Sequence, residues 1–189
     1  MLIRLGQPSG LAVPLDQMKR ELVVNFDDDD DRIEKLTRSE TSRYEIFTRR
    51  IMVPGNFEMC FGCFARRLFL DVGPVRSVIE IAYFDEDGVE HTVSDDLWSL
   101  EPADTTASIR FGDAFVYPDL GDGDWPVRVR FSGGYDLPDA SGSGDDPALA
   151  QDPADATNIM HLVKRIYDGG EIMSEADMRR MMSGRRVLR

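Results

Sequence analysis

The sequence predicts an α+β fold, with N-terminal amphipathic helices, a central antiparallel β-sheet of about five or six short strands, and C-terminal helices after an acidic flexible linker. Apolar residues recur at helical spacing before residue 49 and after residue 159, and they alternate with polar residues in short segments between residues 58 and 135. The connections between these segments are too short to hold a crossover helix, so we expect the strands to be antiparallel.

The length of 189 residues fits one domain with appendages. We expect a core at residues 1–135, with its helices within residues 14–49 and its sheet within residues 58–135. Residues 136–158 are expected to form a flexible acidic linker, and residues 159–189 the C-terminal helices and a basic tail.

Two amphipathic helices are expected near the N-terminus. Leu15, Met18 and Leu22 lie at helical spacing after Pro14. The acidic run Asp27–Asp31 then precedes a longer helix, where carboxylates favour the positive end of the helix dipole. Consecutive residues on a helix point in different directions, so this run predicts a helix start rather than a metal site. One side of the longer helix carries Ile33, Leu36, Glu40, Tyr44 and Phe47.

The clearest strand signal is the stretch Leu68–Phe84. It indicates a strand, a corner at Gly73-Pro74 and a second strand. The turn Asp85–Gly88 then forms a hairpin, since the final glycine accepts the positive φ that tight turns require. Further strands are expected at 89–93, 97–100, 108–111 and 127–131.

The last part of the chain begins with a segment poor in large apolar side chains, residues 136–158. A helix is expected to follow from residue 159, and another after Ser174, which caps its start. The segment Arg179–Arg189 holds five arginines and no acidic residue. Its charge opposes that of the middle of the chain.

The net charge of −13 is concentrated in one third of the sequence. Residues 85–146 contain 16 Asp and Glu against three Arg, and all other residues sum to zero. A surface of this kind repels nucleic acid and argues against ordinary DNA binding.

The sequence offers no recognisable catalytic or cofactor site. It has no glycine-rich phosphate loop, no histidines at metal spacing and no nucleophile beside a base. Cys60 and Cys63 supply only two of the four ligands that structural zinc needs, and His91 and His161 are expected to be structural. We therefore expect a non-enzyme without a metal or cofactor, and keep a redox or zinc function at the two cysteines as a third hypothesis. No apolar run is long enough to cross a membrane, so we expect a soluble protein made in the cytoplasm.

Three motifs stand out in the strand region. They are the Gly-Pro-Val-x-Ser-Val strand entry at 73–78, the hairpin with Tyr83, Asp85, Asp87 and Gly88, and the strand ending with Val129, Phe131, Gly134 and Tyr135. These motifs resemble those of the head-to-tail connector (adaptor) proteins of tailed bacteriophages and gene transfer agents. The N-terminal helix pair also matches in place. The resemblance covers most of the chain, but family members follow the last strand with a short turn where this chain has its long acidic linker.

The resemblance implies a ring of about twelve copies in the virion neck, below the portal protein. Such a ring continues the DNA channel, docks a stopper or tail-terminator protein, and lets DNA pass without specific binding. We expect acidic turns to face the channel or its rim, and the C-terminus to bind the portal. The channel set is Asp85, Glu86, Asp87, Asp122 and Asp124, and the portal set is Met178, Met181, Met182, Arg185, Arg186, Val187 and Leu188.

The alternative hypothesis is a small acidic binding module. It would act as a DNA mimic or as a calcium-dependent interaction protein that uses Asp85, Asp87, Asp122 and Asp124. A high-mass ring distinguishes the first hypothesis, and a calcium-stabilised monomer the second.

Overall fold

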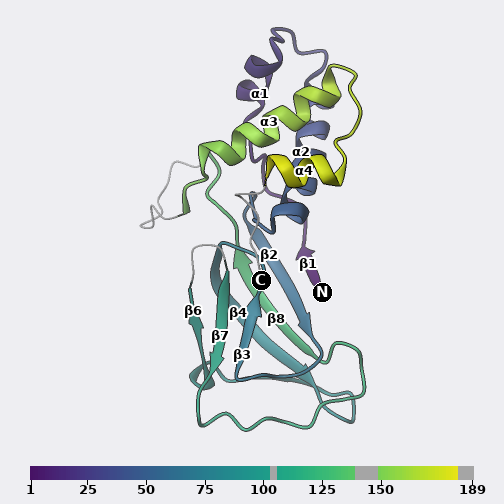
Figure 1. The fold of residues 1–189 in the computed structure, drawn as a ribbon. Helices are drawn as coiled ribbons and strands as arrows, with labels where there is room; N and C mark the ends of the chain where they lie inside the picture. The colour runs from purple at the N-terminus through teal and green to yellow at the C-terminus, as the bar shows by residue number, and fades with distance from the viewer. Residues whose placement is uncertain (103–105, 139–148, 183–189) are drawn as a thin grey trace. The chain divides into compact units, whose positions relative to one another are not determined.

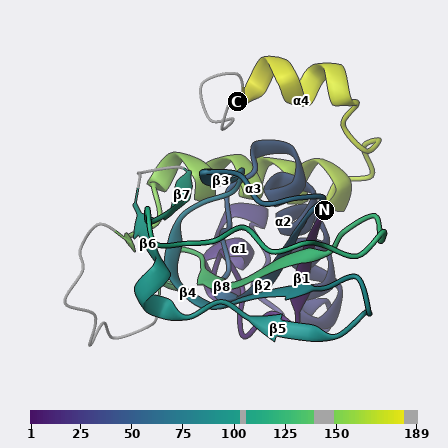
Figure 2. The same cartoon turned by 90° about the horizontal axis from the view of Figure 1, so that it is seen from below.

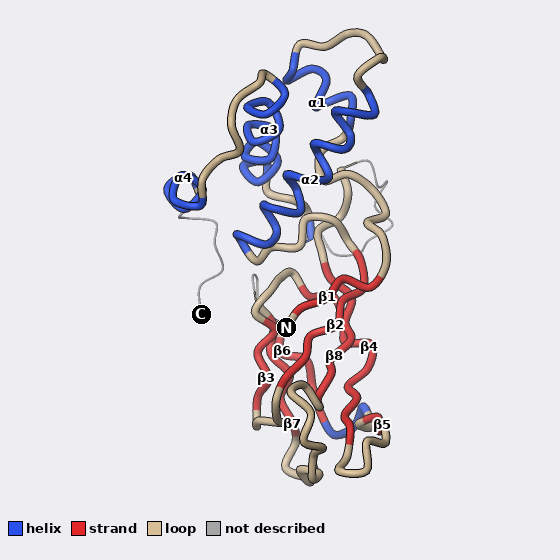
Figure 3. Tube along the Cα trace, turned by 90° about the vertical axis from the view of Figure 1, so that its right-hand side faces the viewer, coloured by secondary structure: helices blue, strands red, loops and turns tan. Residues whose placement is uncertain are grey.

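The computed structural model describes residues 1–102, 106–138 and 149–182 (Figure 1). The chain divides into two compact units. The sheet unit consists of Met1–Gln7 and Gly55–Gly134, and the helical unit of Pro8–Pro54 and Tyr135–Arg189. Figure 3 shows the strands in red and the helices in blue, and every α-helix belongs to the helical unit.

The larger sheet of the sheet unit has five strands in the order β1-β2-β8-β4-β5, and all neighbours are antiparallel. Its central strand β8 alternates strictly, because Val127, Val129 and Phe131 point to the buried face while Arg128 and Arg130 point away. The strands are β1 (Leu2–Leu5), β2 (Gly55–Phe61), β4 (Val75–Phe84), β5 (Glu90–Thr92) and β8 (Val127–Gly133).

The smaller sheet has three antiparallel strands in the order β3-β7-β6. Both sheets are visible from below in Figure 2. The Phe64 ring joins them, since it lies 5.7 Å from the Tyr83 ring of β4 and 5.4 Å from the Phe111 ring of β7. The strands are β3 (Arg67–Leu70), β6 (Trp98–Glu101) and β7 (Ala107–Phe111), with a single 3-10 turn at Asp95–Leu97.

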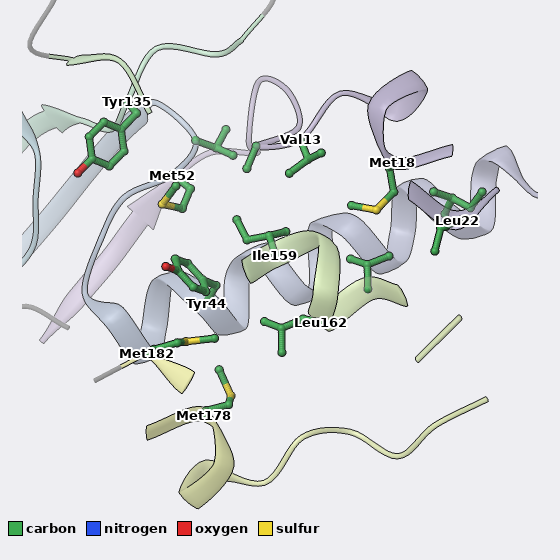
Figure 4. Packing of buried hydrophobic residues seen from close by; sticks show 14 residues of the cluster. Val13, Met18, Leu22, Tyr44, Met52, Tyr135, Ile159, Leu162, Met178 and Met182 are labelled. Atoms are coloured by element: carbon green, nitrogen blue, oxygen red, sulfur yellow. The ribbon is translucent and has the colours of Figure 1, made fainter. Parts of the chain in front are cut away.

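The helical unit contains α1 (Leu15–Leu22), α2 (Asp30–Thr48), α3 (Pro153–Tyr167) and α4 (Glu175–Met181). Figure 4 shows that side chains from all four segments gather in one core. Met18 and Leu22 come from α1, and Tyr44 from α2. Ile159 and Leu162 come from α3. The helical spacing of these apolar residues places them on one face of each helix, and these faces pack against one another.

The structure confirms the α+β class, the antiparallel strands and the helices at both ends of the chain. About five or six strands in one sheet were expected, whereas the described residues form two sheets, of five and three strands. The stretch Leu68–Phe84 does contain two strands, but Gly73-Pro74 carries the chain from the smaller sheet to the larger one.

The division of the chain also differs from the sequence boundaries. The N-terminal helices belong to the same unit as the C-terminal helices, because their apolar faces form one core. Helix α3 begins at Pro153, inside the segment expected to be a linker, and the Asp152 side chain accepts a hydrogen bond from the Ala154 N–H. Of that linker, residues 139–148 lie outside the described residues.

Candidate functional site

The acidic hairpin that follows β4 is held by its own first carboxylate. Oδ1 of Asp85 accepts the backbone N–H groups of Asp87 at 3.0 Å and Val89 at 2.9 Å. Its Oδ2 lies 2.6 Å from Nε2 of His91, whose ring stacks on Tyr83. These hydrogen bonds hold the pKa of Asp85 below its ordinary value, and the bond to His91 makes the largest contribution. The hairpin therefore has a defined shape, and Gly88 closes it with φ of 75°.

A second acidic loop, residues 121–126, lies directly against this hairpin. The Gly121 N–H donates to the Phe84 carbonyl at 3.1 Å, and the Phe84 N–H donates to the Pro126 carbonyl at 2.9 Å. A side chain at Gly121 would place its Cβ 2.6 Å from the Asp85 carbonyl oxygen. Only glycine allows this approach, which brings together two acidic turns that are far apart in the sequence.

The two loops enclose a pocket of about 430 Å³. Asp85, Glu86, Asp122 and Asp124 line it, together with Trp125 and Arg128. Thus four of the five acidic residues expected to act together share one pocket. The fifth, Asp87, belongs to the same hairpin and is exposed.

Arg128 is the cation of this pocket. Its guanidinium lies over the Phe84 ring, 4.7 Å from the centroid. One arginine leaves the four lining carboxylates largely uncompensated, so the pocket surface is anionic and repels phosphate. Within residues 1–102, 106–138 and 149–182, no group of three or more His, Cys, Asp or Glu is placed to hold a metal ion.

A second charged cluster crosses the strands of the larger sheet. Arg130 of β8 forms ion pairs with Glu58 of β2 at 3.0 Å, with Glu80 of β4 at 2.7 Å and with Glu90 of β5 at 3.5 Å. The Thr92 hydroxyl donates to Glu80 at 2.9 Å. One cation therefore holds three carboxylates across four strands, and this face is also anionic overall.

The residues expected to bind the portal divide into three groups. Met178 and Met182 are buried in the core of the helical unit, with exposures of 3% and 0%, and Met181 is partly buried against the same core. Their apolar side chains thus stabilise their own unit, because the spacing that makes α4 amphipathic faces them toward α2 and α3 (Figure 4). Arg185, Arg186, Val187 and Leu188 lie outside the described residues.

A buried polar cluster in the helical unit was not expected from the sequence. The Tyr44 hydroxyl donates to Oδ1 of Asp155 at 2.6 Å, and Nη1 of Arg50 donates to Oδ2 of Asp155 at 3.1 Å. The same Arg50 nitrogen donates to the Tyr135 hydroxyl at 2.8 Å. Burial, and then the bond to Asp155, raise the pKa of Tyr44 well above its ordinary value. Asp155 carries no pattern that marks it, since its partners Tyr44 and Arg50 lie 111 and 105 residues from it along the chain.

The two cysteines are free thiols in different settings. Cys60 is buried on β2 and Cys63 is exposed after it. Burial, and next the neighbouring Glu58, raise the pKa of Cys60, which lowers its thiolate fraction at neutral pH. The N-terminal ammonium and Arg128 act in the opposite direction, but the pKa of Cys60 stays raised.

No helix in the described part of the chain is both long and apolar enough to span a bilayer.

The sequence matches no family model and no curated protein. Solved structures do match the fold along its whole length. All of this chain aligns with 96% of a chain in the virion of a native gene transfer agent particle, with 20% identity and a TM-score of 0.75. The same coverage holds for a chain in the neck of an empty gene transfer agent particle computed with C6 symmetry, with 18% identity and a TM-score of 0.76. It also holds for a chain in the neck of a native particle computed with C12 symmetry, with 19% identity and a TM-score of 0.74. The chain therefore has the fold of a protein found in the neck of gene transfer agent particles.

Proposed function

We propose that this chain is a structural protein of the neck of a tailed-phage-like particle, where it forms a ring of about twelve copies as the head-to-tail adaptor. The observation that carries the proposal is the extent of the structural similarity, which covers 100% of this chain and 96% of each neck or virion chain. The strand-entry, hairpin and strand-ending motifs of the sequence point independently to the same class of protein. The role is non-enzymatic and uses no cofactor.

In this role the ring lies below the portal protein, extends the DNA channel and docks a stopper or tail-terminator protein. The C6 and C12 symmetries of the necks that hold similar chains support a cyclic arrangement. In this position the ring needs to hold neighbouring proteins together and to let DNA pass. Neither task requires catalysis, and an anionic surface does not bind the DNA.

Electron microscopy of the purified chain mixed with the portal protein of the same particle tests the proposal. We expect a cyclic ring of this chain on one face of the portal, with the stopper protein binding its far side. A chain that stays monomeric and separate from the portal in this mixture would overturn the adaptor role. Calcium is the control addition, since a calcium-stabilised monomer would instead support the acidic binding module.

The acidic pocket gives the proposal a second part, in which Asp85, Glu86, Asp87, Asp122 and Asp124 face the channel or its rim. Fixed carboxylates give DNA phosphates no low-energy resting place, so DNA slides past without binding. The pairing of the two loops supports this role, because it concentrates negative charge at one end of the sheet unit.

Neutralising the loops tests their position. A variant with Glu86→Gln, Asp87→Asn, Asp122→Asn and Asp124→Asn keeps Asp85, which holds the hairpin. We expect rings of this variant to retain duplex DNA at low salt where rings of the original chain do not. The matched control neutralises four exposed carboxylates of the helical unit, Asp28, Asp31, Asp168 and Glu171. Equal DNA retention by both variants would show that the loops have no special position.

The portal contact belongs, in this proposal, to the end of the tail, residues 185–188, with α4 as its anchor. Deleting residues 183–189 tests this role without removing Met178 and Met182 from the core. We expect the truncated chain to keep its melting temperature and to lose co-purification with the portal. Undiminished co-purification would contradict the tail contact while leaving the ring itself in place.

A further inference from the structure

The first strand leaves an apolar edge open on the larger sheet. β1 lies at the end of the strand order and, among the strands that the structure describes, pairs with β2 alone. Leu2, Ile3 and Leu5 are 41%, 38% and 42% exposed, although they belong to a strand. Proteins usually protect a free edge with lysine, proline, a bulge or a covering segment, because an open edge is a template for another strand. β1 contains no lysine or proline, and its register with β2 is regular.

The hydrogen bonds of β1 show which backbone groups point away from the sheet. The Met1 amino group donates a hydrogen bond to the Cys60 carbonyl at 3.1 Å, and the Cys60 N–H donates one to the Met1 carbonyl at 2.9 Å. In an antiparallel pair such positions alternate, so at the next pair, Leu2 and Met59, the N–H and C=O groups of Leu2 point away from β2. The edge at Leu2 can therefore accept a strand without disturbing the bonds between β1 and β2.

The opposite edge of the same sheet offers matching groups. The Val93 N–H donates to the Ile81 carbonyl at 2.8 Å, which makes this pair a bonded one. By the same alternation, Thr92 of β5 directs its N–H and C=O away from β4. β5 is short, and all three of its residues are exposed.

Topology and charge decide which edges can meet. Four antiparallel steps separate β1 from β5, so the two edge strands run in the same direction. Copies related by rotation about an axis along the strands can thus place β5 of one beside β1 of the next. The contact joins two different surfaces, and contacts of that kind form a ring when the rotation from copy to copy closes on itself. The charges also agree, since the β1 end carries the N-terminal ammonium and Arg4, whereas residues 85–90 carry four carboxylates.

We propose that β1 of one copy pairs in parallel with β5 of the next copy and so joins the larger sheets head to tail around the ring. This inference rests on the proposed ring and names what holds its copies together. The pairing satisfies outward-facing backbone groups and covers Leu2, Ile3 and Leu5.

Cysteine cross-linking tests the contact directly. The chain carries Ile3→Cys and Thr92→Cys, with Cys63→Ser to remove the exposed thiol, while the buried Cys60 stays. In the proposed pairing Thr92 bonds to Leu2 and Arg4, so Ile3 lies directly opposite it with its side chain on the same face of the joined sheet. Within one copy the two positions are four strand spacings apart, roughly 19 Å, which is too far for a disulfide. We expect mild oxidation of the concentrated protein, alone and with portal, to give a ladder of covalent oligomers that ends at the ring.

Single substitutions separate this contact from others. Each single variant should give no ladder, and a mixture of the two single variants should give only heterodimers. An Ile3→Cys variant that links to itself would indicate a symmetric dimer and overturn the proposal. The matched control pairs Ile3→Cys with Phe69→Cys, an exposed position on β3 of the other sheet, and should give no ladder.

Proline at Leu2 gives a second measurement. Leu2→Pro removes the N–H that points away from β2, and proline is tolerated at such a position of an edge strand. Leu2→Ala is the control, because it shortens the side chain and keeps the N–H. We expect an association constant about tenfold lower for Leu2→Pro than for Leu2→Ala, at equal melting temperature. Rings that form on the portal but show neither the ladder nor this difference would overturn the β1–β5 contact alone, and the absence of any ring would overturn the proposed function.

Discussion

The two units of this chain place their charged groups in opposite ways. The helical unit buries a polar cluster in its interior, where Asp155 has no exposed surface and meets Tyr44 and Arg50. The sheet unit carries most of its charged groups at or near the surface, in the acidic loops and in the Arg130 cluster, of which Glu58 alone is buried. Buried charge stabilises one arrangement only when every partner is present, whereas surface charge remains available to other molecules.

The difference indicates separate tasks for the units. In the helical unit, the cluster ties the residues after α2 to the start of α3 and to Tyr135, the first residue after the sheet unit ends. This arrangement holds the helices in one packing. In the sheet unit, the strands hold the acidic loops in place, and both the loops and the Arg130 cluster carry charge. Changes to the buried cluster should therefore affect stability, and changes to the loops should affect function.

The largest effect is expected from Asp155→Ala. The substitution leaves the Arg50 guanidinium and the Tyr44 hydroxyl without their buried acceptor, and breaking a buried ion pair costs about 3–5 kcal/mol. Chemical denaturation followed by circular dichroism measures the loss of free energy of unfolding, with the helical signal lost first.

The matched control is Asp113→Ala in the sheet unit, because that side chain is 99% exposed and its ion pair with Arg66 is long, at 3.6 Å. We expect the control to change the free energy of unfolding by less than about 0.5 kcal/mol. An equally small loss for Asp155→Ala would contradict the idea that the cluster holds the helical packing.

Arg130→Ala should have the next largest effect, in the sheet unit. Removing the guanidinium leaves Glu58, Glu80 and Glu90 close together without their cation. The Arg130 side chain is 32% exposed, so solvent screens part of the effect, and we expect a loss of about 1–2 kcal/mol. High salt should reduce this loss, since it screens the remaining repulsion. A loss that does not depend on salt would indicate packing rather than charge.

Much of this fold follows from local patterns in the sequence. The helical spacing of Ile33 and Tyr44 and the alternation of Val127–Phe131 correctly predicted the α2 and β8 elements, because each pattern shows which face is buried. β1 was missed, since Leu2–Leu5 has no alternation and is a strand only because it pairs with β2.

The candidate site was predictable in part for the same reason. The acidic turns were recognised from composition, but their meeting depends on the close approach at Gly121, which no local pattern reveals. Asp155 was assigned to a linker because its neighbours are small and polar. Its role comes entirely from partners that are distant in sequence.

Alkaline pH should sharpen the contrast by weakening the helical unit first. The pKa of Tyr44 is raised in the folded protein, so the folded state holds this proton more tightly than the unfolded chain. The contribution is complete below the ordinary tyrosine pKa of about 10 and is lost as the pH rises through the raised value. Between pH 10 and 11 we expect a loss of about 1 kcal/mol, and Tyr44→Phe should lack this component. A helical signal with the same pH dependence in both proteins would contradict it.

The smallest effect is expected at the acidic hairpin. The pKa of Asp85 is lowered in the folded protein, so its carboxylate stabilises the fold above the ordinary Asp pKa, and this contribution is lost as the pH falls through the lowered value. Asp85→Asn should therefore melt slightly below the original chain at pH 7, and the two melting temperatures should converge in strong acid. Asp87→Asn, in the same turn, is the control and should match the original chain at both pH values, because Asp87 takes part through its backbone N–H. If the difference in melting temperature between Asp85→Asn and the original chain persists in acid, the hairpin depends on the shape of the Asp85 side chain rather than on its charge. The sheet unit would then hold its acidic loops by packing, and the contrast with the helical unit would be smaller.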